Sequence, residues 1–300
     1  MLLRTLALVA FGLAGATAGG ALAAESALDG IKDAKKVVIM NDLSAAPWQF
    51  RDAAGNPAGF SIDLDRMIAA KLDVDLELRN VEWAGLIPGL LTRKSDLLAT
   101  SMTVTPKRAE QILFTKQPWY STGVVMIVRP DTTATSWEEL NAAGKRIAVK
   151  AGTSAVDIAK QSFPNAEIQS YPNDTDTYQA LKTNRVDGAL NDLAVLGVVG
   201  QEYGFVSLKQ PRELISQDDW AFAVRPDDAA TQEFLDSFLT EIKANGQLEA
   251  LRAYWVDGED WKADFLASNG GVSDARKKLV EQLGIAAYVP ESGGTRATLE

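Results

Sequence analysis

The sequence predicts an α/β protein of two lobes joined by two hinge strands. Strand-like runs alternate with helical patterns twice, once between about residues 35 and 102 and again between about 145 and 202, as in folds whose helices cover a mostly parallel sheet. Two extended apolar runs, STGVVMIVRP at 121–130 and WAFAVRP at 220–226, border the second set. Because one run enters the second lobe and the other leaves it, we expect them to pair as crossover strands that form a hinge.

The first set begins with KKVVIM at 35–40, a β-branched run typical of a buried strand, and a loop follows at its carboxyl end. Turn residues at 51–59 predict a small hairpin. Ser61 is placed to cap a helix over about 62–72. A strand near 74–81, a helix near 85–93 and a strand over 96–102 continue the alternation.

The second set has the same character. Its predicted strands cover 145–150, 166–171 and 187–191, and its predicted helices cover about 155–162, 175–184 and 192–202. Beyond residue 227 a helical stripe over 234–242 is typical of ordinary core packing, and another helix begins after Gly246. From these elements we expect the first lobe to comprise residues 35–122 and 225–262 and the second lobe residues 127–220.

Residues 263–300 are predicted to form a partly disordered C-terminal extension. Within it, the serine and glycine that bracket 273–284 favour a helix, whereas PESGGTRATLE at 290–300 has the composition of a disordered tail.

The first 23 residues are predicted to be a secretory signal. An early Arg4 precedes an apolar stretch that ends in small residues. A permanent membrane anchor is disfavoured because four glycines break that stretch. The mature protein is therefore expected in a bacterial periplasm.

The composition excludes several function classes. The chain has no His and no Cys, which removes Ser-His triads, cysteine nucleophiles, the usual zinc sites and disulfides. Its net charge of −10 disfavours nucleic-acid binding. Ligand binding without a metal or other cofactor is the leading class, and acid-base catalysis by carboxylates is a second.

An anion site is predicted at ATSMTVTPKRAEQILFT, residues 99–115. Ser101, Thr103 and Thr105 alternate at a predicted strand end, so their hydroxyls lie on one face. Thr105 and Pro106 are typical of a helix N-cap and first helical position. Arg108 in that first turn opposes the helix dipole unless an anion is bound, which favours a carboxylate ligand. The alternative is a surface arginine beside an ordinary cap.

Three segments resemble the polar amino-acid binding proteins of bacterial ABC importers, solute-binding protein family 3. They are PWQFRDAAGNPAGFSIDLDRMIAAKL, VEWAGLIPGLLTRKSDLLATSMTVTPKRAEQILFTKQPWYSTG and AVKAGTSAVDIAK, within a colinear match from about Val37 to Trp255. The resemblance implies the two-lobe periplasmic-binding-protein (type II) fold, which closes on one small solute. Two positions depart from the family pattern: Ser61 stands where an acid is usual, and Ala45 where an aromatic is frequent.

The resemblance also implies roles for individual residues. Arg108 matches the arginine that pairs with the ligand α-carboxylate, with Thr103 and Ser101 beside it. In the second lobe, Asp192 matches the acid that accepts from the α-ammonium. The loop amides of Thr153 and Ser154 add donors. From the residues alone, Asp192 follows a strand end at a predicted helix start, where it could face a crevice or only cap the helix.

The specificity positions implied by the resemblance are Asp42, Trp83, Lys150 and Asn191. Of these, Asp42, Lys150 and Asn191 argue for a polar ligand side chain. Two of the four positions have ordinary alternatives: Trp83 as a core residue and Lys150 as a solvated residue at a strand end. Because Ala45 removes the usual aromatic lid, Trp48 or Trp83 is expected to replace it, unless the lid is absent.

The sequence therefore predicts a periplasmic binding protein, not an enzyme, that captures a small zwitterionic solute, a polar amino acid, as a monomer for an inner-membrane ABC permease. Two alternatives stay open. One is an enzyme of the cyclohexadienyl dehydratase type, which the resemblance includes, and the other is a sensory module that signals to a receptor.

Overall fold

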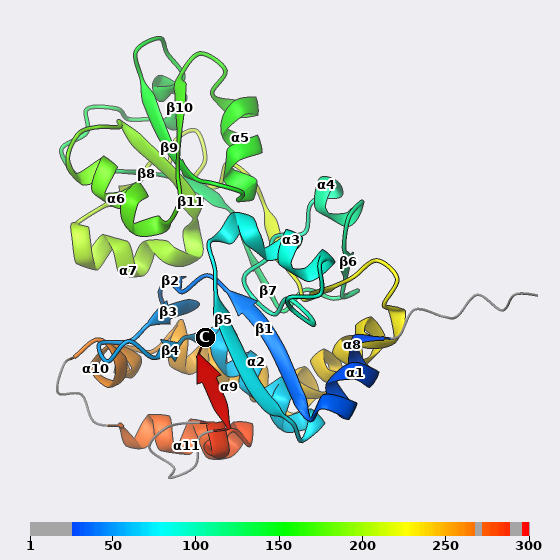
Figure 1. Ribbon diagram of the computed structural model, residues 1–300. Coiled ribbons are helices and arrows are strands. Elements are labelled where there is room, and N and C mark those ends of the chain that lie inside the picture. Colours follow the sequence, from blue (N-terminus) through cyan, green and yellow to red (C-terminus); the bar gives the residue numbers. More distant parts are fainter. Residues whose placement is uncertain (1–25, 268–271, 289–295, 300) are drawn as a thin grey trace, which may run out of the picture.

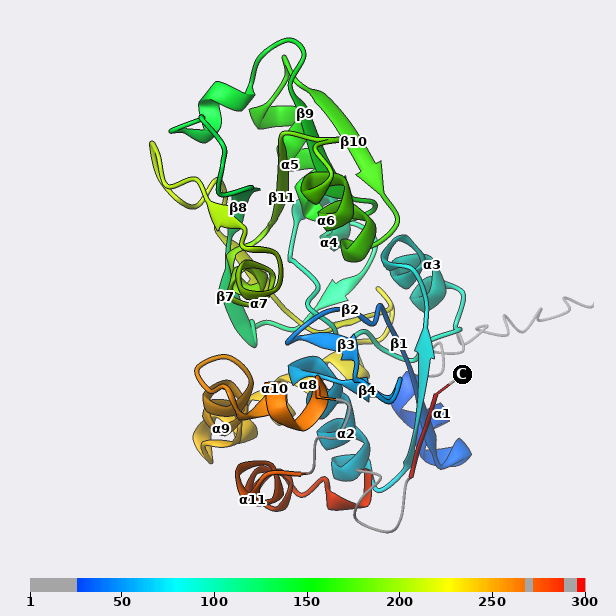
Figure 2. The same ribbon diagram turned by 90° about the vertical axis from the view of Figure 1, so that its left-hand side faces the viewer.

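The computed structural model describes residues 26–267, 272–288 and 296–299. The predicted signal peptide, residues 1–23, lies outside these residues. Two bodies stand one above the other, and two strands connect them (Figures 1 and 2). None of the helices in the described segments combines the length and the apolar character that crossing a bilayer requires.

The first lobe, lower in Figure 1, contains a parallel sheet in the order β1-β5-β15. Its strands are β1 (Lys36–Asn41), β5 (Asp75–Asn80) and β15 (Ala297–Leu299). Two small antiparallel sheets complete its strands: β2 (Ser44–Ala45), β3 (Gln49–Arg51) and β4 (Pro57–Ala58) form one, and β6 (Leu113–Phe114) and β14 (Ala223–Val224) the other.

The helices of the first lobe come from both ends of the chain and from the segments between its strands. They are α1 (Ala27–Ala34), α2 (Phe60–Leu72), η1 (Trp83–Gly85), α3 (Leu86–Leu91), α4 (Pro106–Ala109), α8 (Ala229–Ala244), α9 (Gln247–Trp255), α10 (Asp260–Phe265), α11 (Asp274–Leu283) and η3 (Ala286–Tyr288).

The second lobe has a five-stranded mixed sheet in the order β10-β9-β11-β8-β12. Strands β10 (Glu167–Tyr171), β9 (Arg146–Lys150) and β11 (Gly188–Asp192) run parallel. Strand β8 (Val124–Val128) pairs antiparallel with both β11 and β12 (Val206–Ser207). Its helices are η2 (Trp137–Leu140), α5 (Ser154–Ser162), α6 (Asp174–Lys182) and α7 (Leu193–Tyr203). All six elements predicted over 145–202 are present, with ends shifted by one or two residues.

Two crossover strands pair as predicted, but they lie at the ends of the two extended runs, whose remaining residues form β8 of the second lobe and β14 of the first. Strand β7 (Tyr120–Thr122) is antiparallel to β13 (Asp218–Trp220), with Ser121 opposite Asp219. These strands connect the lobes and lie beside the boundary between them (Figure 1).

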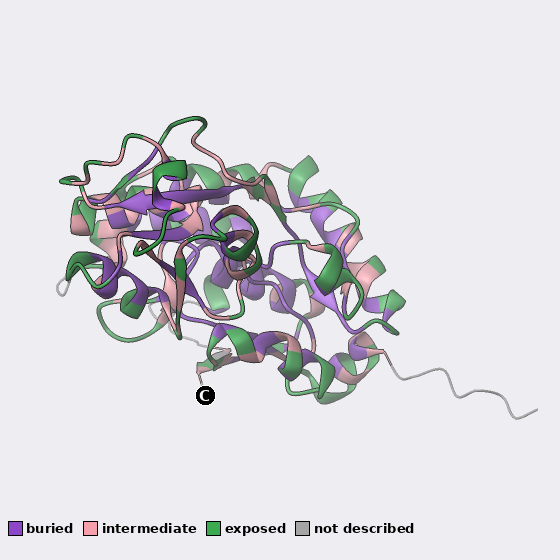
Figure 3. Cartoon of the chain, turned by 90° about the horizontal axis from the view of Figure 1, so that it is seen from above, coloured by how far each residue is buried: buried purple, intermediate pink, exposed green. Residues whose placement is uncertain are grey.

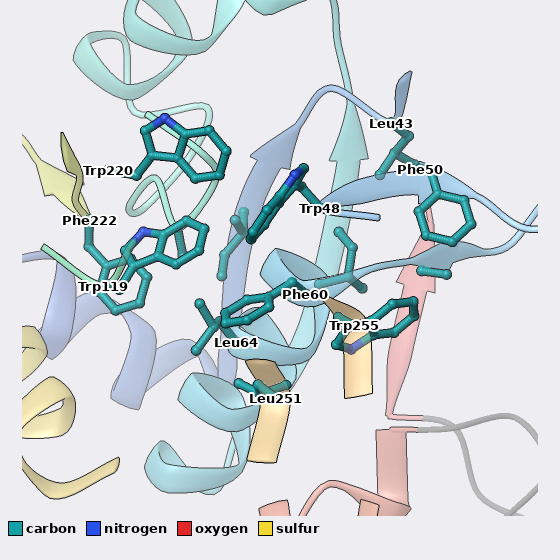
Figure 4. Close-up of a cluster of buried hydrophobic side chains, with 14 of the residues drawn as sticks. Leu43, Trp48, Phe50, Phe60, Leu64, Trp119, Trp220, Phe222, Leu251 and Trp255 are labelled. Atoms are coloured by element: carbon teal, nitrogen blue, oxygen red, sulfur yellow. The ribbon is translucent and has the colours of Figure 1, made fainter. Parts of the chain in front are cut away.

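Aromatic side chains fill the part of the first-lobe core that faces the second lobe (Figure 4). The Trp48 ring lies 4.8 Å from that of Trp220 and 4.5 Å from that of Tyr120, and Phe60 stacks on Trp119 at 5.3 Å, all between ring centroids. Buried strands lie inside each lobe beneath more exposed helices and loops (Figure 3). One buried hydrophobic cluster fills the first lobe and continues onto one face of the second-lobe sheet, and a second cluster covers the other face of that sheet.

Two local predictions for the first lobe are wrong. Helix α2 begins at Phe60, with Gly59 as its N-cap at φ 128°, so Ser61 lies inside the helix and donates its hydroxyl to Gln49. Only glycine fits here, because a Cβ at residue 59 would lie 2.3 Å from the Trp48 carbonyl oxygen. The segment 96–102 is not a regular strand: single bridges join Leu97 to Ile39 and Leu98 to Ala223.

The C-terminal extension is partly ordered. Ser273 caps α11 and Gly284 ends it in the left-handed conformation, as predicted. In contrast to the predicted disorder of 290–300, Ala297–Leu299 form β15 on the edge of the first-lobe sheet. Residues 289–295 and 300 lie outside the described residues.

Candidate functional site

A small cavity lies between the lobes at the carboxyl ends of their strands. Its volume is about 30 Å³, room for little more than water. Nine of the ten predicted site residues line it, namely Trp83, Ser101, Thr103, Arg108, Lys150, Thr153, Ser154, Asn191 and Asp192. The other lining residues are Ala45, Trp48, Gln49, Asp174, Val195 and Trp220.

Arg108 enters the cavity from the first lobe. Thr105 caps α4 by accepting from the Arg108 amide, and Pro106 takes the first helical position, as predicted. The buried guanidinium donates to the carbonyl of Thr103 (2.8 Å) and, across the lobe boundary, to that of Gly152 (3.1 Å). Burial lowers the pKa of Arg108 to about 10, and nearby Asp192 opposes that shift, so the group stays cationic at neutral pH.

Asp192 enters from the second lobe, at the junction of β11 and α7. It occupies the N-cap position of α7, yet its side chain accepts no capping hydrogen bond, so the cap-only interpretation is wrong. Its Oδ1 is buried and has no hydrogen-bond partner within the described chain. Burial, reinforced by the charges of Asp218 and Asp174, raises the pKa of Asp192 to about 7. An additional donor in the cavity would satisfy this carboxylate.

The predicted hydroxyl residues gather around Arg108 from both lobes. Ser101 accepts from Gln49 (2.8 Å), and Ser154 donates to Thr103 across the lobe boundary (3.4 Å). The Thr153 hydroxyl donates to the Lys150 carbonyl (2.8 Å) and is the N-cap residue of α5. Thr105 does not line the cavity, because its side chain serves the cap instead.

Lys150 is buried, so the solvated alternative for this residue is wrong: only 4% of it is exposed. Its ammonium pairs with Asp42 of the first lobe (3.1 Å) and Asp174 of the second (2.8 Å). Asp42 does not line the cavity but contacts Lys150, which does. Asn191 donates to Asp174 (2.8 Å). Sequence reasoning missed Asp174, which looks like an ordinary first-turn acid of α6.

The aromatic side chains form walls of the cavity. Trp83 is buried, its ring lies 5.1 Å from the Lys150 ammonium, and its amide donates to Asp42 (3.0 Å). Trp48 packs in the aromatic cluster of Figure 4, and its indole N–H donates to the Ala194 carbonyl of the second lobe (3.2 Å). Both tryptophans therefore reach the cavity from the first lobe beside Ala45.

Residues 37–258 match the family of bacterial extracellular solute-binding proteins, family 3. The chain belongs to this family. Among curated relatives, the ABC transporter arginine-binding protein 1 of Escherichia coli (strain K12) is 29% identical over 229 residues, 75% of this chain and 93% of that protein. The histidine-binding periplasmic protein of Salmonella typhimurium is 25% identical over 231 residues, 74% of this chain and 88% of that protein.

Solved structures show the same two-lobe fold. The ancestral amino acid-binding protein AncCDT-1, a precursor of cyclohexadienyl dehydratase, superposes with a TM-score of 0.72 at 28% identity, covering 77% of this chain and all of that one. The arginine-bound form of a truncated ArgBP from T. maritima gives a TM-score of 0.66 at 30% identity, covering 71% and 99%. The type II periplasmic-binding fold predicted from the sequence is therefore confirmed, and these family members are amino-acid-binding proteins.

Proposed function

We propose that this protein is the periplasmic substrate-binding component of an ABC importer and captures a polar amino acid by hinge closure. The observation that carries the proposal is the pair of opposite charges from separate lobes, Arg108 and Asp192, that line one cavity. Among the described residues, the Arg108 guanidinium donates to the backbone carbonyls of Thr103 and Gly152, and Asp192 Oδ1 has no donor. A zwitterion would meet both groups.

Closure follows from the positions of these groups. The α-carboxylate would pair with Arg108, beside Thr103 and Ser101, with donors added by Thr153 and Ser154. The α-ammonium would donate to Asp192. Because the two charges belong to different lobes, only the closed molecule makes both contacts, so ligand binding shifts the hinge equilibrium towards closure. The closed shape is what a permease would recognise.

The first experiment is a thermal-shift screen of the mature protein against amino acids and related zwitterions, including betaine-like and opine-like compounds. A compound that binds only the folded protein raises its melting temperature. If no zwitterion raises it, the proposed function is wrong.

The second experiment tests Arg108 with the ligand from that screen. Arg108→Ala is expected to weaken binding by about 2 to 5 kcal/mol, because the carboxylate then lies in the closed site without its charge partner. Isothermal calorimetry measures this loss. Lys107→Ala is the matched control. The neighbouring Lys107 is exposed and pairs with Asp157 (3.2 Å), so the affinity of this variant for the ligand should stay near that of the wild type.

Several further properties belong to the same proposal. Residues 1–23 would direct export, the mature chain would act as a monomer, and the lobes would comprise 35–122 with 225–262 and 127–220, with 263–300 as an addition to the first lobe. The relatives named for arginine and histidine support an importer role because they are named as transport or periplasmic binding proteins.

We also propose that the chain is not an enzyme. Asp174 is an extra acid in the cavity wall, but it already accepts from Lys150 and Asn191, so it is not free to act as an acid or base. Incubating the purified protein with prephenate or arogenate should give no product, and turnover would establish the dehydratase alternative. A sensory role would be favoured if a gene knock-out changed chemotaxis but not growth on the solute.

A further inference from the structure

Lys150 uses all three of its ammonium protons inside the protein. It donates to Asp174 Oδ2 at 2.8 Å, and its nitrogen lies 3.1 Å from both Asp42 Oδ2 and Ser44 Oγ. Asp42 and Ser44 belong to the first lobe, and Asp174 and Lys150 to the second. The ammonium therefore joins the lobes at the cavity wall.

The two carboxylates of this cluster are also fully engaged. Asp42 Oδ1 accepts from the Ser44 hydroxyl (2.5 Å), and its Oδ2 accepts from the Trp83 amide (3.0 Å). Asp174 Oδ1 accepts from Asn191 (2.8 Å). Every carboxylate oxygen thus has a donor, and the Trp83 ring covers the ammonium. A ligand would therefore have to compete with partners that each charged group of this network already has.

The cluster faces the side chain of the ligand if the proposed function is right. Arg108 and Asp192 would take the two main-chain charges, and Lys150, Asp174 and Asn191 line the rest of the same cavity. A cationic side chain would have to displace Lys150 or lie beside a like charge. An anionic side chain would add a third carboxylate around one ammonium. Both arrangements cost free energy in a buried site.

We propose that Lys150 supplies, from within the protein, the cation that a basic ligand would otherwise bring, and that the site therefore selects a zwitterion with an uncharged side chain. The inference rests on the proposed amino-acid-binding function and narrows its substrate class.

The test is Lys150→Met, which keeps the length of the side chain and removes its charge. Calorimetry with L-arginine, L-glutamate, L-serine and L-asparagine gives the ratio of the affinity for arginine to that for the best uncharged ligand. The wild-type protein should bind an uncharged ligand and show no measurable heat with arginine or glutamate. In the variant, the ratio should rise at least tenfold, because Asp174 in the cavity wall and Asp42 behind it then have no internal cation.

Lys145→Met is the matched control, because Lys145 belongs to the same lobe but is exposed on its surface beside Asp187. The ratio of arginine affinity to uncharged-ligand affinity in Lys145→Met should equal that of the wild type. If Lys150→Met does not fold, Lys150→Met with Asp42→Asn restores the net charge of the cluster and still leaves Asp174 without its ammonium. This double variant should also gain arginine binding.

Three outcomes overturn the inference. Wild-type protein that binds arginine or glutamate as tightly as any uncharged amino acid contradicts it directly. An unchanged ratio in the folded lysine variants shows that Lys150 does not exclude cations. If neither the wild type nor the lysine variants bind any amino acid, the proposed function itself fails, and the inference falls with it.

Discussion

The surroundings of Asp192 disfavour its charged, deprotonated form. Burial raises its pKa to about 7, and the nearby carboxylates of Asp218 and Asp174 add to the shift, whereas Arg108 and Lys150 reduce it. Without a ligand the group is therefore partly protonated at neutral pH. An ammonium beside it would favour the charged form and lower the pKa again.

This shift predicts a pH dependence of binding. Below pH 7 the ligand must displace a proton from Asp192, so affinity falls as the pH falls, whereas above pH 7 the carboxylate is already charged and affinity is constant. At pH 5 the dissociation constant should be about 100-fold higher than at the plateau, by proton linkage from a pKa of 7. Calorimetry between pH 5 and 8 measures it.

The matched variant is Asp192→Asn, which cannot titrate. It should bind more weakly at pH 8 and show no change in affinity between pH 5 and 7. Equal wild-type affinity at pH 5 and pH 8 would show that Asp192 does not accept the ammonium.

Single residues also show where sequence reasoning ends. The role of Arg108 could be predicted because its signals are close in sequence. Thr105 caps the helix, Pro106 takes its first position, and the arginine charge opposes the helix dipole in the first turn. Asp174 could not be predicted, because its role depends on Lys150 of the neighbouring strand β9 and on Asp42 of the other lobe. Such contacts join residues that are far apart in the chain, and no local pattern marks them.

At the scale of elements, helix α11 is attached to the first lobe by a buried ion pair. Both terminal nitrogens of Arg276 donate to Asp63 of α2, one of them at 2.9 Å. Asp63 also accepts from Arg66 (2.9 Å) and from the Trp255 indole (2.9 Å). The family match ends at residue 258, so this helix lies beyond the matched region yet completes a charge network inside it.

Arg276→Ala is expected to lower the free energy of unfolding by about 3 kcal/mol, because it leaves a buried carboxylate short of a partner. Urea denaturation followed by circular dichroism measures the loss. Lys277→Ala, on the next residue, removes only an exposed pair with Asp274 and should stay within about 0.5 kcal/mol of wild type. Equal stabilities of the two variants would mean that α11 is not coupled to α2.

The elements differ in how well the sequence predicts them. The second lobe follows its pattern closely because its strands and helices alternate with clear hydrophobic periods. Strand β15 was not predicted because a run of three residues is too short to show a hydrophobic period. These residues form a strand because they pair with β5. The expected strand at 96–102 is irregular because its residues bridge to two different strands, β1 and β14.

At the scale of the whole molecule, the lobes meet closely at Gly152. This residue has φ +76°, and its carbonyl accepts from Arg108 of the other lobe. A Cβ built on it would lie 2.9 Å from Cα and 3.0 Å from Cβ of Ala84, which belongs to the first lobe. Only a residue without a side chain allows this approach.

Gly152→Ala should therefore hinder closure and raise the dissociation constant of the ligand at least tenfold. Small-angle scattering with saturating ligand should give a larger radius of gyration than for the wild type. Gly144→Ala is the matched control: it has a similar φ of +83° but nothing within 4 Å of its added Cβ, so it should cost stability without changing affinity. A similar loss of affinity in both variants would assign the effect to backbone strain.

The aromatic cluster gives the molecule a spectroscopic signal of its own. Trp48 bonds to the second lobe through Ala194, while Trp119 and Trp220 pack beside it at the two crossover strands. Separation of the lobes would break the hydrogen bond from the Trp48 indole and expose this face to solvent. The wavelength of tryptophan emission, excited where tyrosine absorbs little, should therefore shift. Stopped-flow fluorimetry of the unlabelled protein would then measure the rate at which the lobes close on the ligand.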